Sequence, residues 1–94
     1  MLLKDQLLQN AELWGMVQRE GVRQVQKWGV QERTPFEWMT YVTEEVGETA
    51  KAISEHEYRG GMQSTVVKEA IQAATLLLKI AEIYILPIPY NKKR

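Results

Sequence analysis

Apolar residues recur along the chain at helical spacing, and no long stretch alternates between apolar and polar positions as a half-buried strand would. The pattern predicts three helices, at about residues 3–28, 35–58 and 65–86. Turns containing glycine or proline separate them, at residues 29–35 (GVQERTP) and at Gly60-Gly61. We therefore expect one all-α domain over residues 1–94, a helical bundle with three main helices per chain.

The start of the second helix is the clearest boundary in the sequence. Thr34 precedes a proline and lies three residues before Glu37, an arrangement typical of a capping box with proline at the first helical position. Ser64 or Thr65 is expected to cap the third helix. Two internal glycines predict an irregular first helix that could break near one of them.

The third predicted helix is apolar on nearly all sides. At roughly 100° per residue, one face carries Val66, Ala70, Ala73, Leu77, Ile80 and Tyr84. Apolar cover continues round the cylinder through Val67, Ile71, Ala74, Leu78 and Ala81. Such a helix is usually buried on several sides, and three helices in one chain cannot easily enclose it. We therefore expect a homo-oligomer, a dimer or tetramer with this third helix near the interface, to complete the bundle; the alternative is a locally apolar surface on a monomer.

Composition narrows the possible partners. Twelve Lys and Arg residues balance twelve Asp and Glu residues, so no basic field is available for binding nucleic acid. No segment approaches the roughly 20 apolar residues that cross a bilayer, and the opening MLLKDQLLQN lacks the apolar run of a signal peptide. The absence of cysteine fits a reducing compartment. We expect a cytoplasmic protein that binds neither nucleic acid nor membrane.

The second predicted helix has three distinct sides. Stepping by roughly 100° per residue gives a core side, expected to face the rest of the bundle, with Met39, Val42, Val46, Thr49 and Ile53. A side of small residues, where another helix could approach closely, consists of Thr43, Gly47, Ala50 and Ser54. The acidic side carries Glu44, Glu45 and Glu48, which can converge within one turn despite their mutual repulsion.

The third helix offers a polar counterpart to this acidic side. Glu69 and Gln72 are three residues apart and share a face. If the short connection at residues 57–64 makes the two helices antiparallel, these groups can face the acidic side across the bundle. They would then form an oxygen-rich site suited to Mg²⁺ or Mn²⁺. Taken alone, the E-E-x-x-E pattern is also common on solvent-exposed acidic helix faces.

Four segments read together resemble a known family. In order along the chain they are QKWGVQ (26–31), TPFEW (34–38), TEEVGETAKAI (43–53) and KEAIQAATLLLKIAE (68–82). The chain is similar to the MazG-like nucleotide pyrophosphohydrolases of the all-α NTP pyrophosphatase superfamily, of the short single-domain type. The resemblance covers roughly residues 18–84. It implies a helical dimer or tetramer that binds Mg²⁺ and hydrolyses a (d)NTP to the monophosphate and pyrophosphate, a reaction suited to the house-cleaning of nucleotides.

The resemblance also implies roles for individual residues. Glu44, Glu45 and Glu48 match the first family motif, E-E-x-x-E, and Glu69 matches the glutamate of the second, E-x-x-D. Gln72 stands where the family has aspartate, and its neutral amide oxygen is a weaker ligand for a hard dication. Metal ligation is thus expected from Glu45, Glu48, Glu69 and Gln72. Glu44 would accept a proton from the attacking water.

Basic and aromatic residues near these motifs are the expected substrate contacts. Lys27 and Trp28 lie where a loop begins, and Trp38 is a second candidate to stack on the base. Either tryptophan would also suit a hydrophobic core. The lysines placed to offset the charge of the triphosphate are Lys51, Lys68 and Lys79. Each of these is also typical of a solvated helix surface.

The same residues bear on three other classes of protein. A non-catalytic helical oligomer, which binds nucleotides or a protein partner and has a degraded metal site at Gln72, fits the pattern as well. A di-iron carboxylate bundle requires Glu-x-x-His pairs, and isoleucine stands three residues before His56, so this class is excluded. The tail NKKR is too short a basic patch for a DNA-binding helix-turn-helix.

Overall fold

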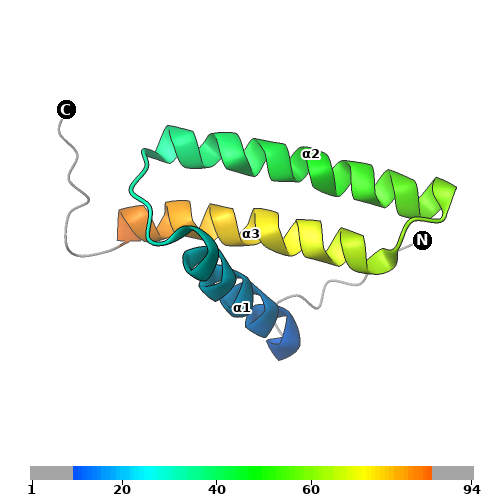
Figure 1. Cartoon of the computed structure of the whole chain (residues 1–94), viewed down its shortest axis with the longest axis horizontal. Helices are drawn as coiled ribbons and strands as arrows, with labels where there is room; N and C mark the ends of the chain where they lie inside the picture. Colours follow the sequence, from blue (N-terminus) through cyan, green and yellow to red (C-terminus); the bar gives the residue numbers. More distant parts are fainter. Residues whose placement is uncertain (1–9, 86–94) are drawn as a thin grey trace.

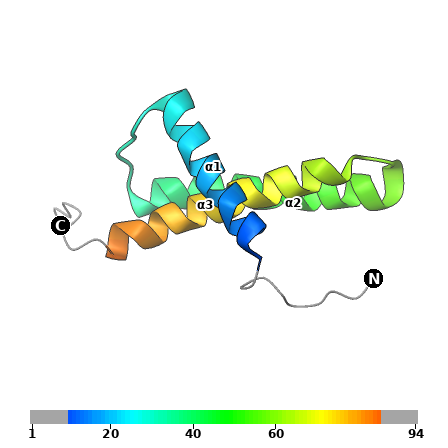
Figure 2. The ribbon, with the colours of Figure 1, turned by 90° about the horizontal axis from the view of Figure 1, so that it is seen from below.

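The computed structural model describes residues 10–85, which form three α-helices and no strand. The helices are α1 (Ala11–Trp28), α2 (Pro35–Arg59) and α3 (Gln63–Ile85). α2 and α3 lie side by side as an antiparallel hairpin, and α1 packs across α3 (Figure 1; Figure 2). The predicted all-α bundle of three helices is confirmed for this part of the chain.

Local chemistry sets both ends of α2. The Thr34 hydroxyl accepts a hydrogen bond from the backbone N–H of Glu37 at 3.1 Å. The Glu37 carboxylate in turn accepts one from the N–H of Thr34 at 2.8 Å. At the other end Gly60 adopts a left-handed conformation with φ 75°, which glycine tolerates best. The predicted capping box and the glycine stop are both present.

The boundaries of α1 and α3 differ from the expectations. Asn10 caps α1 by accepting a hydrogen bond from the N–H of Leu13 at 3.0 Å, so the helix begins at Ala11. The earlier residues of the predicted helix, 3–9, lie outside the described residues. α1 continues unbroken through both of its glycines, and the predicted break is absent.

The third helix begins about two residues earlier than expected. Ser64 and Thr65 lie within α3, which starts at Gln63, so neither is its cap. The predicted cap was wrong because the sequence alone does not distinguish a serine or threonine within the first turn of a helix from one that precedes the helix. The described part of α3 ends at Ile85, and residue 86 lies outside it.

The core lies between α2 and α3, around the Trp38, Val42 and Leu76 side chains. The side of α2 that faces this core is rotated by roughly 60° from the predicted one, and Val42 belongs to both sides. Trp38, Val42 and Ala52 are buried, whereas the predicted core residues Met39, Val46 and Ile53 are half exposed. Glu45 lies on the inward side and is only partly accessible.

The single chain leaves much apolar surface open. No large side chain among residues 10–85 is completely buried. α3 buries Ile71, Ala73, Thr75 and Leu76, while Leu77 and Leu78 are each 46% exposed. The expected burial of α3 on several sides is therefore not achieved within one chain. None of the helices in the described range is long and apolar enough to cross a membrane.

Candidate functional site

A cavity of about 530 Å³ lies among all three helices. Its walls come from the end of α1, the connection to α2, the first half of α2 and the second half of α3. Sequence-predicted residues that line it are Trp28, Trp38, Glu45, Gln72 and Lys79. The three helices thus bring together residues from all four family-like segments.

Two aromatic rings of α2 form one wall, and each carries a cation. Trp38 and Tyr41 pack edge to face, with ring centroids 6.0 Å apart. The Lys79 ammonium lies 5.0 Å from the centroid of the Trp38 ring. The Arg33 guanidinium lies 5.2 Å from the centroid of Tyr41. This wall of the cavity therefore combines aromatic rings with positive charge.

A third aromatic residue lies at the end of α1. Trp28 is 53% exposed and lines the cavity, whereas Trp38 is mostly core. The Lys27 ammonium lies 4.7 Å from the centroid of the Trp28 ring, and the Arg23 guanidinium 5.7 Å from it. Of the two tryptophans, Trp28 therefore offers the more accessible ring for stacking.

The carboxylates of Glu45 and Glu69 lie on either side of a shared partner, the side-chain amide of Gln72. With its nitrogen turned toward them, this amide donates to Glu69 Oε1 at 2.8 Å and to Glu45 Oε2 at 3.2 Å. Glu69 and Gln72 come from α3 and Glu45 from α2, as the predicted antiparallel arrangement requires. Since Glu45 and Gln72 also line the cavity, this polar group opens directly into it.

Negative charge is concentrated at Glu45. Burial raises the pKa of the Glu45 carboxyl above its ordinary value, and repulsion from Glu69 and then Glu48 raises it further. The pKa of a carboxyl next to a bound cation would instead be lowered. Glu45 and Glu69 therefore form a partly buried pair of carboxylates with excess negative charge, and carboxylate oxygens are ligands that Mg²⁺ prefers.

The remaining predicted acids are less closely gathered. Glu44 and Glu48 are both exposed on α2 and are not among the residues lining the cavity. Within residues 10–85, no group of three or more His, Cys, Asp or Glu side chains is close enough to hold a metal ion. The structure thus joins two carboxylates through an amide and leaves Glu48 as a neighbour that acts on Glu45 through its charge.

The predicted lysines divide into two groups. Lys79 lines the cavity, and Lys27 lies against the Trp28 ring that lines it. Lys51 and Lys68 are exposed and do not contribute to the cavity wall. The structure therefore associates the first pair with the candidate site and leaves the second pair on the helix surface.

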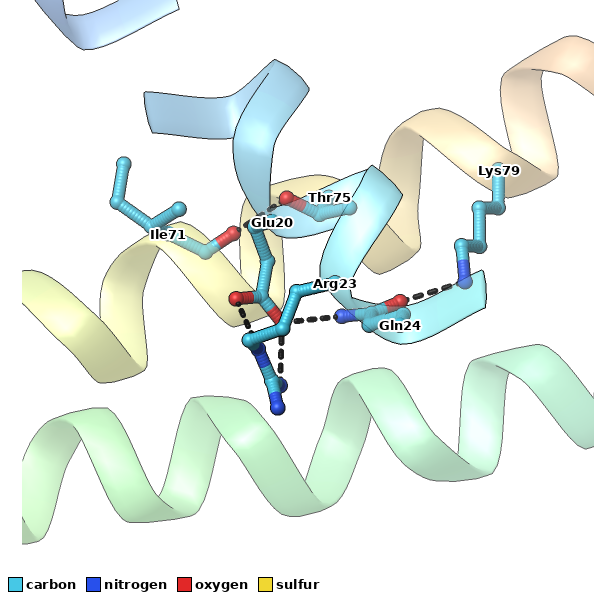
Figure 3. A network of polar contacts seen from close by, with 6 residues as sticks. All are labelled: Glu20, Arg23, Gln24, Ile71, Thr75 and Lys79. Atoms are coloured by element: carbon cyan, nitrogen blue, oxygen red, sulfur yellow. Dashed lines mark hydrogen bonds and ion pairs between the residues drawn. The ribbon is translucent and has the colours of Figure 1, made fainter. Parts of the chain in front are cut away.

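A hydrogen-bonded network that the sequence analysis missed connects α1 to Lys79 (Figure 3). Arg23 holds the Glu20 carboxylate through two hydrogen bonds of 2.8 and 2.7 Å. Gln24 Nε2 donates to Glu20 Oε2 at 2.8 Å, and Gln24 Oε1 accepts from the Lys79 ammonium. The hydrogen bond from Arg23 lowers the pKa of Glu20, against the opposing effect of burial. The i, i+3 and i, i+4 spacing of the three α1 residues was the available signal.

Comparison of the chain with family models, with curated proteins and with solved structures found no match. A functional assignment therefore depends on the geometry of the site.

Proposed function

We propose that this protein is a Mg²⁺-dependent nucleoside triphosphate pyrophosphohydrolase, converting a (d)NTP and water to the (d)NMP and pyrophosphate. One observation carries the proposal. Glu45 and Gln72 line a cavity whose other walls combine aromatic rings with cations, and the Gln72 amide links Glu45 to Glu69 behind that wall. A nucleotide has the complementary parts: a flat base, and phosphates that bind both divalent ions and basic side chains.

The oxygen donors at the carboxylate end fit a hard divalent ion. Glu45 and Glu69 would hold Mg²⁺, or Mn²⁺ in its place, and the side-chain oxygen of Gln72 would join them. Glu48, which is exposed and outside the cavity wall, would complete the protein ligands by turning its side chain toward the ion. For Gln72 this requires its amide to rotate, so that its oxygen replaces its nitrogen beside the carboxylates. When bound, the ion supplies charge neutralisation for the phosphates and polarises a water.

The chain's own side chains account for binding and proton transfer. Trp28 at the end of α1 offers its exposed ring to the base. Lys79 and Arg33 line the cavity, and Lys27 lies against Trp28, so these cations are available to phosphate oxygens. Glu44, exposed and free of the Gln72 bridge, is the carboxylate left to accept a proton from the attacking water.

Turnover of a panel of NTPs and dNTPs with Mg²⁺, followed by pyrophosphate release, tests the proposal. Glu48→Gln should lower kcat by at least about a hundredfold, because even outer-shell partners of a bound metal contribute 10–100-fold. The matched control is Glu57→Gln, also exposed on α2 but near its end and outside the cavity wall. A wild-type protein without turnover or metal-dependent nucleotide binding would refute the assignment, and an active Glu48→Gln variant would remove the metal role.

The Gln72 bridge also favours a second candidate, a non-catalytic nucleotide-binding oligomer. The amide satisfies Glu45 and Glu69 without any cation, which is what a degraded metal site would look like. This candidate keeps the aromatic and basic walls and so predicts nucleotide binding that is insensitive to chelation. The same panel separates the two, since metal-independent binding without pyrophosphate release supports only the second.

Either function would be carried by an oligomer. We propose that copies of this chain associate through the exposed apolar side of α2, whose members are Met39, Val46 and Ile53. The small residues Gly47 and Ala50 lie beside this side and are also exposed. A Cβ added at Gly47 would meet no atom within 4 Å, so space for a second helix is available there.

A further inference from the structure

Gln24 is the buried residue of α1, and it is polar. Its side chain is almost fully enclosed, with 6% of the residue exposed, while Trp14 and Val25 on the same helix remain largely accessible. A buried amide is costly unless its donor and acceptor atoms are both used. Both are used here, by Glu20 on the same helix and by Lys79 on α3.

The orientation of the Gln24 amide is determined by its two hydrogen-bond partners, Glu20 and Lys79. An ionised carboxylate only accepts hydrogen bonds and an ammonium only donates them. Glu20 therefore requires the amide nitrogen, and Lys79 requires the amide oxygen. Arg23 holds Glu20 through a bidentate contact, which leaves the carboxylate little freedom to release the amide. Figure 3 shows the order of these contacts, from Arg23 through Glu20 and Gln24 to Lys79.

We propose that Gln24 is a positioning residue that directs the Lys79 ammonium into the cavity, where it binds a phosphate group of the ligand. This inference rests on the proposed function and deepens it, since it names the residue of α1 on which the phosphate-binding cation depends. Gln24 itself lines the cavity but contributes through Lys79.

The surroundings of Lys79 agree with this role. Its ammonium lies over the Trp38 ring and beside Gln24, and burial lowers its pKa while Glu20 and Glu82 oppose that effect. The cation is thus partly deprived of water, and charged phosphate oxygens bind such a cation more strongly than one on an open surface. Without Gln24, the flexible side chain would retain only the Trp38 ring and the more distant acids as constraints.

A double-mutant cycle on phosphate binding tests the proposal, with inorganic tripolyphosphate and Mg²⁺ as the probe. Gln24→Met keeps the length of the side chain and removes both hydrogen bonds, and we expect it to weaken binding about tenfold. Lys79→Met should weaken binding at least as much. In the double variant, Gln24→Met should cause no additional loss, because its effect passes through Lys79. Gln18→Met, exposed on the same helix, is the matched control.

Two outcomes would overturn the inference. One is unchanged tripolyphosphate affinity in Gln24→Met; the other is a double variant whose loss is the product of the two single losses. A merely structural role for Gln24 predicts that second result, together with a lowered melting temperature.

The Lys79 side-chain resonances in ligand-free protein, assigned with Lys79→Arg, separate this inference from the proposed function. They should shift in Gln24→Met and stay unchanged in Gln18→Met. If wild-type protein binds no tripolyphosphate, the phosphate site of the proposed function and the ligand role of Lys79 both fail. Unshifted Lys79 resonances in Gln24→Met would refute the positioning itself.

Discussion

The amide of Gln72 lies between two carboxylates and can serve them in two ways. Its nitrogen donates to both Glu69 and Glu45, which offsets part of the repulsion between them. Turned over, its oxygen would join the carboxylates as a third hard ligand in the proposed metal site. An ionised aspartate at this position would supply only the second function, because it has no hydrogen to donate. A glutamine here thus supports the metal-free protein as well as a metal-bound one.

We expect Gln72→Asp to lower the melting temperature in the presence of a chelator and to enlarge the rise in melting temperature that Mg²⁺ produces. A third carboxylate adds repulsion on the order of 1 kcal/mol, or about 4–8 °C for a domain of this size. It is also the better ligand once the ion binds, so linkage to Mg²⁺ strengthens.

Thermal melts with a chelator and with Mg²⁺ measure both effects. Gln18→Asp, exposed within α1, corrects for the lower helix propensity of aspartate. An equal rise with Mg²⁺ in wild type and Gln72→Asp would contradict the metal assignment.

At the scale of the helix, the residue at which α2 begins determines which side chains line the cavity. The capping box at Thr34 ends the connection from α1, of which Gly29, Val30, Gln31 and Arg33 contribute to the cavity wall. It also fixes the start of the helix on which Trp38 and Tyr41 lie. Gly29 has a φ of 75°, which an L-residue rarely adopts, so the chain can leave α1 sharply toward that wall. Local sequence signals at the start of α2 therefore place one wall of the cavity. Residues of α3 form another wall.

Thr34→Ala should destabilise the protein by about 1 kcal/mol, because the N–H of Glu37 loses its side-chain acceptor. Chemical denaturation followed by circular dichroism measures the change. Thr40→Ala is the control, since its exposed hydroxyl bonds only to the Phe36 carbonyl within the helix. That change should be neutral or slightly stabilising, given the higher helix propensity of alanine. Equal losses in both variants would show that the cap contributes nothing specific.

At the scale of the whole molecule, several large apolar side chains on α2 and α3 are exposed. Val46 and Ile53 on α2 and Leu77 and Leu78 on α3 are each about half exposed. Large exposed apolar patches usually mark an interaction surface. The charge balance of the chain supplies no strong net repulsion between copies. Association of identical chains is the simplest way to cover this surface.

We expect light scattering with size-exclusion chromatography to show a dimer or tetramer at micromolar concentration. Val46→Glu places a charge in the proposed interface and should shift the protein toward monomer, because burying an unpaired carboxylate is costly. Val30→Glu is the matched control, as Val30 is 86% exposed in the connection between α1 and α2. A wild-type protein that is monomeric at these concentrations would refute the oligomer.

The local signals in the sequence were sufficient for the number of helices, for the ends of α2 and for one pairing in the candidate site. Capping boxes, glycine stops and helical spacing act within a few residues, so the span of α2 was predicted to within one residue of the observed end. The pairing of Glu45 with Glu69 and Gln72 also followed, once α2 and α3 were taken as antiparallel.

The tertiary structure decided what local spacing leaves open. The sequence of α2 contains two stripes with the same helical period, and only the position of α3 determines that the Trp38, Val42 and Ala52 side is buried. Similarly, Gln24 and Lys79 are 55 residues apart, and neither carries a pattern that predicts their contact. The physical reason is that burial depends on which surfaces meet, and this is a property of the packed chain rather than of any one helix.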